Sequence, residues 1–499
     1  METIRKTPLS LGVAAGLGLL LASTGAMAIS TGTDLNLSAK ARAGGMAGAA
    51  YTMPQEASAA VFGNPATLTQ FKGINMNFGA SYLGLKSIDI ETSSTIAALG
   101  GGVSTSSKSD ADNYIVPDFG LTLQVSPNLV LGTGLEVDAG LGADYRDDPI
   151  SLLGTGLVTI PLNVELISFN ANLAAAYQAT EKLSIGGAVT IGFALAQLGT
   201  TGPTGGGAGL TALLGSDAPT DLDGPGPLPA IGANLGINDF GGTTSSVHDI
   251  GFSGSLGATY EVQEGVMLSA AYKTKHEYNF TNILYQDTSL NGPSGNGAGL
   301  GSGAFGPDYQ DLSVAQPAEV IVGVAFDNVI AQGLLVEADV VWKNWSDAAT
   351  YENAYDDQFL FLLGAQYETG DWSFRAGYSY AEDILRSDPD TTLDSLVGLG
   401  TLPVGDGGPF GNDIVKIAQA TLLPVIWNHT ITAGVGYAIT DAVSIDAYAA
   451  YAFGEEETVD LPKIQDAAVA YVVPVTELQL EAQVDYEFMV GAGINIALP

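Results

Sequence analysis

The chain has 499 residues, of which 46% are hydrophobic and only 14% are charged, and its mean hydropathy is +0.24. An ordinary soluble domain carries roughly 25% charged residues, and this apolar composition also excludes a disordered chain. Sixteen basic and 54 acidic residues give a net charge of -38, which would repel a nucleic acid. The lack of cysteine excludes disulfides, zinc–thiolate sites and thiol catalysis.

The N-terminus has the three-part form of a secretory signal. Basic residues precede an apolar run over residues 9–21, and Ala26-Met27-Ala28 supplies small residues at a cleavage site. We expect residues 1–28 to be a signal peptide, and the alternative is an uncleaved anchor over residues 9–27. No second apolar run of about eighteen residues follows. Apolar residues are instead spread over short segments, as they are in a membrane β-barrel.

Alternation with a period of two is the main structural signal. From Ile250 to Val262 apolar residues hold the even positions and small or polar residues the odd ones. After a Gln263-Glu264-Gly265 turn the alternation resumes from Val266 to Phe280, where Lys273 falls on the polar side. This pattern predicts a long hairpin with one oily face.

About fourteen such segments occur, and short turns alternate strictly with long linkers between them. The segments are Ile74–Leu83, Ile115–Val125, Leu129–Val137, Leu166–Ala179, Leu183–Leu195, His248–Val262, Val266–Phe280, Ala318–Val329, Gly333–Trp345, Phe359–Glu368, Trp372–Glu382, Pro424–Ala438, Val443–Phe453 and Leu478–Ile496. The turns are residues 126–128, 180–182, 263–265, 330–332, 369–371 and 440–442. The prediction is an all-β fold, a 14-stranded antiparallel transmembrane β-barrel over residues 73–499 in the bacterial outer membrane, with short periplasmic turns and long extracellular loops. A soluble β-sandwich or adhesin is the alternative.

Aromatic residues cluster at the ends of these segments, as expected of residues at membrane interfaces. One group flanks the short turns: Tyr260, Tyr367, Trp372 and Tyr437. A second group lies at the opposite ends: Tyr278, Phe280, Trp345, Tyr380 and Phe453. We therefore expect two aromatic belts.

Residues 29–72 precede the barrel and alternate too poorly to be membrane strands. They contain a Gly/Ala-rich run over residues 41–50, followed by Asn64-Pro65-Ala66. A barrel of fourteen strands has a lumen too wide for its own side chains to fill, so this segment is a candidate plug inside the lumen. A mobile periplasmic tail is the alternative.

Two runs in that segment, residues 41–51 and 57–66, resemble the hatch of the FadL family of outer-membrane long-chain fatty acid transporters. Further matches lie along the barrel, in residues 316–318, 341–346, 372–378 and 429–437. The resemblance implies a barrel closed by a hatch, and the hatch positions that we expect to take part in gating are Arg42, Gly44, Gly45, Asn64, Pro65 and Ala66.

The resemblance also implies a route for uptake of long-chain fatty acids or other hydrophobic compounds. The ligand would be captured by apolar loops, pass to a pocket in the lumen, and leave sideways through a gap made by a kinked third strand. In the third segment Gly132 and Gly134 could permit a kink, or they could only accommodate barrel curvature. Candidate capture residues, whose alternative is a loop folded on itself, are Leu210, Leu213, Leu214, Leu228, Ile231, Leu290 and Phe305.

A fatty acid would need a cation for its carboxylate, and Lys273, Lys343 and Arg375 are candidates on the lumen side. These cations could instead be structural partners of acids, with Glu261, Glu277, Glu337 and Asp339 as the candidate acids. Because the whole chain is strongly acidic, a neutral hydrocarbon or aromatic cargo stays open.

Other functional classes have weaker support. A general porin for small polar solutes would need an open lumen without a hatch. An outer-membrane lipid-modifying enzyme could draw on only three histidines, and the chain contains no G-x-S-x-G or H-E-x-x-H motif. We expect no catalytic residue, cofactor or metal. The expected partners are a hydrophobic small molecule and outer-membrane lipid, and the expected state is a monomer.

Overall fold

The computed structural model describes residues 37–96, 99–145, 147–151, 154, 159–160, 163–199, 230–233, 247–287, 307–389, 412–422, 428–471 and 474–499. The signal-peptide residues 1–28 lie outside these ranges, so that interpretation stays a prediction. No helix within the described ranges is long and apolar enough to cross a membrane.

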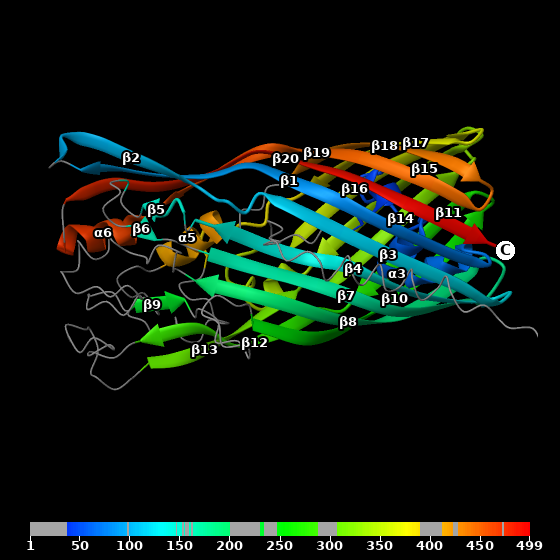
Figure 1. The fold of residues 1–499 in the computed structure, drawn as a ribbon, viewed down its shortest axis with the longest axis horizontal. Coiled ribbons are helices and arrows are strands. Elements are labelled where there is room, and N and C mark those ends of the chain that lie inside the picture. The colour runs from blue at the N-terminus through cyan, green and yellow to red at the C-terminus, as the bar shows by residue number, and fades with distance from the viewer. Residues whose placement is uncertain are drawn as a thin grey trace, which may run out of the picture.

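Fourteen antiparallel strands form a closed barrel, which confirms the predicted fold class. The wall closes because β1 (Ile74–Ile96) pairs on one side with β3 (Asn113–Ser126) and on the other with β20 (Val475–Leu498) (Figure 1). The remaining wall strands are β4 (Leu129–Asp144), β7 (Asn163–Gln178), β8 (Leu183–Gly199), β10 (Val247–Gln263), β11 (Val266–Lys273), β14 (Glu319–Asp327), β15 (Leu334–Lys343), β16 (Gln358–Thr369), β17 (Trp372–Ala381), β18 (His429–Thr440) and β19 (Val443–Asp460). Because the sheet closes on itself, no wall strand is an edge strand over its whole length.

The six predicted turns all join neighbouring wall strands at one end of the barrel, which we call the turn end. The opposite end, which we call the loop end, carries further elements (Figure 1). They are β2 (Gly101–Lys108), β5 (Ile150–Ser151), β6 (Thr159–Ile160), β9 (Ala230–Ala233), β12 (His276–Asp287), β13 (Pro307–Gln316), the 3-10 helix η3 (Trp345–Asp347), α5 (Asp413–Leu422) and α6 (Pro462–Tyr471).

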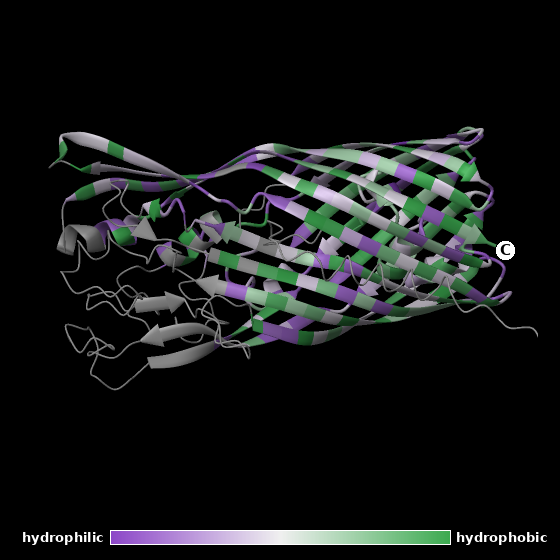
Figure 2. Ribbon diagram, in the orientation of Figure 1, coloured by the Kyte–Doolittle hydropathy of each residue, from purple (hydrophilic) through white to green (hydrophobic). Residues whose placement is uncertain are grey.

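Alternate side chains of each wall strand point outward. The outer face is apolar because these alternate positions hold most of the large hydrophobic residues. Figure 2 shows these residues as green patches alternating with paler ones along the strands. Near the turn end, Tyr260, Tyr367, Trp372 and Tyr437 all have exposed side chains. The rings of Trp372 and Tyr437 are 4.7 Å apart on neighbouring strands. The aromatic belt expected beside the short turns is therefore present.

The second expected belt is wrong for three of its five members. Tyr278, Phe280 and Trp345 are buried, whereas Phe453 is exposed. Trp345 lies in η3, after the end of β15, whereas Tyr278 and Phe280 are displaced by a break in the expected strand over residues 266–280. β11 ends at Lys273, and β12 leaves the barrel sheet to pair with β13 and β9. The alternation continues through the break, but the apolar side chains now turn inward.

Candidate functional site

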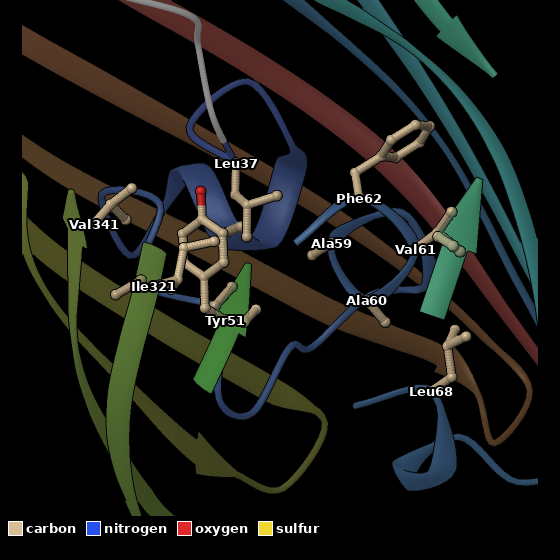
Figure 3. Packing of buried hydrophobic residues seen from close by; sticks show 14 of the residues in the cluster. Leu37, Tyr51, Ala59, Ala60, Val61, Phe62, Leu68, Ile321 and Val341 are labelled. Carbon is tan, nitrogen blue, oxygen red and sulfur yellow. The ribbon is translucent and has the colours of Figure 1, made fainter. Parts of the chain in front are cut away.

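Residues 37–72, which we call the inner segment, lie inside the turn-end half of the barrel (Figure 1). The segment contains α2 (Ala41–Gly44), α3 (Ala57–Phe62) and the 3-10 helix η1 (Pro65–Gln70). α2 contacts β18, β19 and β20, α3 contacts β3 and β4, and η1 contacts β7, β8 and β10. Because these strands come from different sides of the wall, the segment occupies the bore. Figure 3 shows Leu37 and Tyr51 of the segment beside Ile321 and Val341 of the wall.

Glycines allow the inner segment to approach the wall closely. A Cβ added at Gly186 of β8 would lie 2.5 Å from the backbone nitrogen of Ala66. On the other side, a Cβ at Gly44 would lie 2.5 Å from the ring of Tyr448. One at Gly45 would lie 3.2 Å from Arg375 Cβ. Interiors are close-packed, so a methyl group at the two tighter positions would displace backbone or a buried ring.

The predicted kink glycines also face the inner segment. A Cβ at Gly132 would lie 2.9 Å from Leu68, and one at Gly134 would lie 2.7 Å from Phe62. Both glycines pair regularly with β3 and β7. The register of β4 against β7 shifts instead at Asp138, between Val137 and Ala139.

Backbone pairing between β3 and β4 is interrupted near Asp138, and the interruption extends from there towards the loop end. The pairing runs from the turn end up to Asp118 and Glu136, and beyond these residues β4 pairs with β7 while β3 pairs with β1. The two stretches of backbone meet again at the loop end, where the amide of Asp110 donates a hydrogen bond to the carbonyl of Asp144 at 2.8 Å. Residues 113–117 and 137–143 flank this interruption. Its inner side is apolar and includes Tyr114, Val116 and Val137, and Ala39 of the inner segment packs there.

Two groups of charges bind the inner segment to the wall. Lys40 Nζ lies 2.5 Å from Glu136 Oε2, at the last paired position of β4. Arg42 Nε lies 2.9 Å from one oxygen of Asp446, and Arg375 Nη1 lies 2.8 Å from the other. Asp446 therefore holds two guanidinium groups together, one from the inner segment and one from the wall. Such charge-assisted contacts are stronger than neutral hydrogen bonds.

Two neighbouring acids hold the tip of the inner segment. Glu337 accepts hydrogen bonds from the backbone amides of Thr52 at 2.7 Å and Met53 at 3.0 Å. Asp339 accepts one from the Thr52 hydroxyl at 2.9 Å. The Thr52 hydroxyl also lies 2.7 Å from the hydroxyl of Ser269. From the sequence, Glu337 and Asp339 were candidate partners of the lumen cations. In the structure they bind backbone amides and a hydroxyl group of the inner segment.

Glu56 lies within the inner segment and accepts hydrogen bonds at 3.0 Å from the amides of Arg42 and Ala43, at the start of α2. Its other oxygen is buried and has no hydrogen-bond partner among the described residues. Burial, and after it the charge of Asp118, raise the pKa of this carboxyl to about 7, although the two amides and the charge of Arg42 act to lower it. Asn64 is also internal, and its side chain accepts from the amide of Ala66 at 3.1 Å, capping η1.

A row of three charged side chains crosses the wall just above the inner segment. Lys273, Glu319 and Lys343 occupy directly opposed positions on β11, β14 and β15. Each lysine Nζ lies 3.1 Å from a different oxygen of Glu319. The row borders the inner segment, because Lys273 Nζ lies 5.8 Å from the ring centre of Tyr51. We call this set the lysine–glutamate row.

Towards the loop end, the row is followed by buried aromatic rings. Trp345 makes edge contacts with Tyr351 and Tyr355, at ring-centre distances of 5.0 and 5.6 Å. Tyr278 and Phe280 of β12 belong to the same apolar cluster. We call these five residues the aromatic cluster. The Trp345 indole donates to Gln358 at 3.3 Å, and Gln358 pairs across the sheet with Lys343, so the cluster and the row adjoin.

The structure thus brings the hatch residues and the three candidate carboxylate partners into the barrel. The capture residues Leu210, Leu213, Leu214, Leu228, Leu290 and Phe305 lie outside the described residues, and only the backbone of Ile231 is described, in β9. Sequence reasoning missed the aromatic cluster and the acids Glu136, Glu319 and Asp446. The acids lay in predicted strands or beside them, but their pairing required the register.

A closed apolar-faced barrel whose bore is occupied by its own N-terminal residues defines a class of outer-membrane protein. The sequence model of the outer membrane protein transport protein family (OMPP1/FadL/TodX) matches residues 20–392, more than half of the chain. The chain therefore belongs to this family of outer-membrane transport proteins, and both the resemblance seen in the sequence and the outer-membrane location are confirmed.

Individual relatives agree with this assignment. Outer membrane protein P1 of Haemophilus influenzae is 25% identical over 341 residues, covering 65% of this chain and 71% of the relative. The toluene transporter TodX of Pseudomonas putida has a similar fold, with a TM-score of 0.59, 20% identity, and coverage of 93% of this chain and 99% of TodX. A FadL homologue from Pseudomonas aeruginosa also gives a TM-score of 0.59, at 13% identity, covering 94% and 99%.

Proposed function

We propose that the protein imports hydrophobic compounds across the outer membrane. The loops at the loop end would capture the compound, the aromatic cluster would pass it into the lumen, and the wall would release it sideways between β3 and β4. Burial of apolar cargo is favourable by about 0.8 kcal/mol for each CH2 group, so this route needs no chemical reaction. The relatives named as toluene transporters make this class of cargo reasonable.

The observation that carries the proposal is the meeting of the inner segment with the interruption in the wall. The segment contacts strands from different sides of the wall at the turn end, which supports a role as a plug against polar solutes. Within the segment, Ala39 packs among the apolar residues of the interruption, and Lys40 binds Glu136 at the turn-end edge of the interruption. A movement of residues 39–40 would therefore act directly on the place where the wall lacks backbone pairing.

Deletion of Asp138 tests sideways release. The deletion removes the extra residue between Val137 and Ala139, whose pairing partners Phe169 and Ser168 are already adjacent. β4 would then run straight against β7, and we expect uptake of radiolabelled 1-dodecanol into expressing cells to fall to the level of cells without the protein. Asp138→Asn is the matched control, because it removes the charge and keeps the extra residue. Normal uptake by the deletion variant would contradict the proposal.

A further inference from the structure

The cations inside the barrel are each held by an acid. The described residues place five basic side chains inside: Lys40, Arg42, Lys273, Lys343 and Arg375. Lys40 is bound to Glu136, the two arginines share Asp446, and the two lysines of the lysine–glutamate row share Glu319. A carboxylate entering the lumen would therefore have to displace an acid that is already bound.

The acids outnumber the bases in this part of the molecule. Nine acidic side chains lie inside the barrel among the described residues: Glu56, Asp118, Glu136, Asp138, Glu319, Glu337, Asp339, Asp446 and Glu487. Asp138 of β4 also interacts electrostatically with Lys273, Lys343 and Glu319, so a second acid faces the two lysines of the row. The field at the row thus offers an anion no net attraction.

A fatty acid that enters from the loop end with its carboxylate first would bring that head group to the row. A chain inserted from the loop end meets the aromatic cluster first and the row next, with Tyr51 of the inner segment beyond it. Glu319 is covalently tethered beside both lysines, so its effective concentration there is about millimolar or higher, and a dilute external carboxylate competes poorly. Desolvating that carboxylate without a partner would cost several kcal/mol.

We propose that the lysine–glutamate row selects uncharged hydrophobic compounds and rejects carboxylates, with Glu319 as the residue that determines this specificity. This inference rests on the proposed function and names its substrate class. Long-chain alcohols, hydrocarbons and simple aromatic compounds are cargo, whereas ionised fatty acids are not. Replacement of Glu319 by a neutral residue would remove the acid that both adjacent lysines bind at 3.1 Å and convert the row into a carboxylate site.

The test compares two probes that differ only in the terminal group, radiolabelled 1-dodecanol and dodecanoate, at pH 8. Initial uptake is measured in cells that lack their own outer-membrane fatty acid transporter and express this protein. We expect the wild-type protein to take up dodecanol at least about tenfold faster than dodecanoate. Glu319→Gln should raise the dodecanoate-to-dodecanol ratio about ten- to a hundredfold, the effect of one or two new charge-assisted hydrogen bonds.

Two control variants separate a local effect from a general change of lumen charge. Glu319→Asp keeps the charge at the row and should keep the wild-type ratio. Glu337→Gln removes an equally buried acid that holds Thr52 instead of a lysine, and it should also keep the ratio. An equal gain in Glu337→Gln would overturn the role of the row.

The wild-type comparison needs no variant and decides the substrate class directly. Wild-type uptake of dodecanoate at the rate of dodecanol would overturn the inference and leave the proposed function standing. Uptake of neither probe above the level of cells without the protein would instead overturn the proposed function. If Glu319→Gln assembles, as judged by its heat-modifiable mobility on gels, an unchanged ratio would also overturn the inference.

Discussion

The two halves of the barrel interior are held together by different forces. In the turn-end half the inner segment is bound by ion pairs, buried acids and hydrogen bonds to individual wall residues, and glycines bring the backbones together. In the loop-end half the aromatic cluster is held mainly by ring packing. Directional contacts specify one position and are lost abruptly, whereas ring contacts can be exchanged for those of a guest molecule. The first arrangement suits a gate and the second suits a passage.

The largest expected effect comes from locking the turn-end half covalently. The hydroxyls of Thr52 and Ser269 are 2.7 Å apart, so cysteines at these two positions would have neighbouring sulfur atoms, and the chain has no cysteine of its own. In Thr52→Cys/Ser269→Cys we expect oxidation to reduce dodecanol uptake to background, and a reductant to restore it.

A second cysteine pair serves as the matched control for this lock. Thr69 and Ser184 have hydroxyls 2.8 Å apart, but Thr69 lies close to the connection with β1, where the segment has little freedom to move. Oxidised Thr69→Cys/Ser184→Cys should transport normally. Full uptake by the oxidised Thr52→Cys/Ser269→Cys protein would show that the tip of the segment need not move.

The next largest effect comes from forcing the inner segment off the wall. Gly186→Val places a side chain on the backbone of Ala66, so η1 must move, and we expect reconstituted protein to gain a porin-like conductance. Gly187→Val is the control on the same strand, since its nearest neighbour is the flexible tip of Leu256 at 3.2 Å. A closed channel in Gly186→Val would mean that the segment does not block the bore.

A change of pH should alter the free energy with which the inner segment docks on the wall, by a smaller amount than the changes above. Burial in the docked segment raises the pKa of Glu56 to about 7, from an ordinary value of 4.5. The docked state therefore keeps a proton that the undocked state loses. Docking is strongest below pH 4.5, weakens between pH 4.5 and 7, and is constant above that range. The full difference is about 3 kcal/mol, or roughly a hundredfold in the undocked population.

Hydrogen exchange at the amides of Arg42 and Ala43 measures this effect, because both amides donate to Glu56. Protection should fall between pH 5 and pH 8 by more than the intrinsic exchange rates predict. Glu56→Gln supplies the reference without a titrating group. Equal pH dependence in the two proteins would show that another group controls docking.

The smallest expected effect concerns the loop-end half. Trp345→Ala removes two edge contacts between rings, each worth about 0.5–1.5 kcal/mol, so the apparent KM for dodecanol should rise about tenfold. Protection of the Arg42 and Ala43 amides should not change, since the two halves use separate contacts. Trp372→Ala, on the exposed outer face, is the matched control. An unchanged KM would remove the aromatic cluster from the route.

The wall was predictable from sequence because its signals are local. Alternation sets the outward face, and each short turn fixes the pairing of the strands that flank it, as between β14 and β15. The departure of β12 was not predictable, because alternation does not say which sheet a strand joins. The partner of Lys273 was missed for a related reason. Its pairing with Glu319 crosses a long loop, so no local pattern fixes that register.

The two strand-three glycines teach a similar lesson about the inner segment. From the sequence, Gly132 and Gly134 could permit a kink or only accommodate barrel curvature. In the structure their missing side chains make room for Leu68 and Phe62, which are far away in sequence. The irregular position is Asp138, an acidic residue with no conformational signal of its own. Packing partners of this kind become visible only when the segment and the wall are placed together.

The lysine–glutamate row is set by three adjacent strands of the closed wall, whereas the entrance is built from long connecting loops. Mutations that reshape the entrance can therefore accumulate over generations without disturbing the head-group filter beneath it. A descendant protein could therefore acquire a new entrance and keep the same preference for uncharged compounds. One substitution at residue 319 would be enough to change that preference.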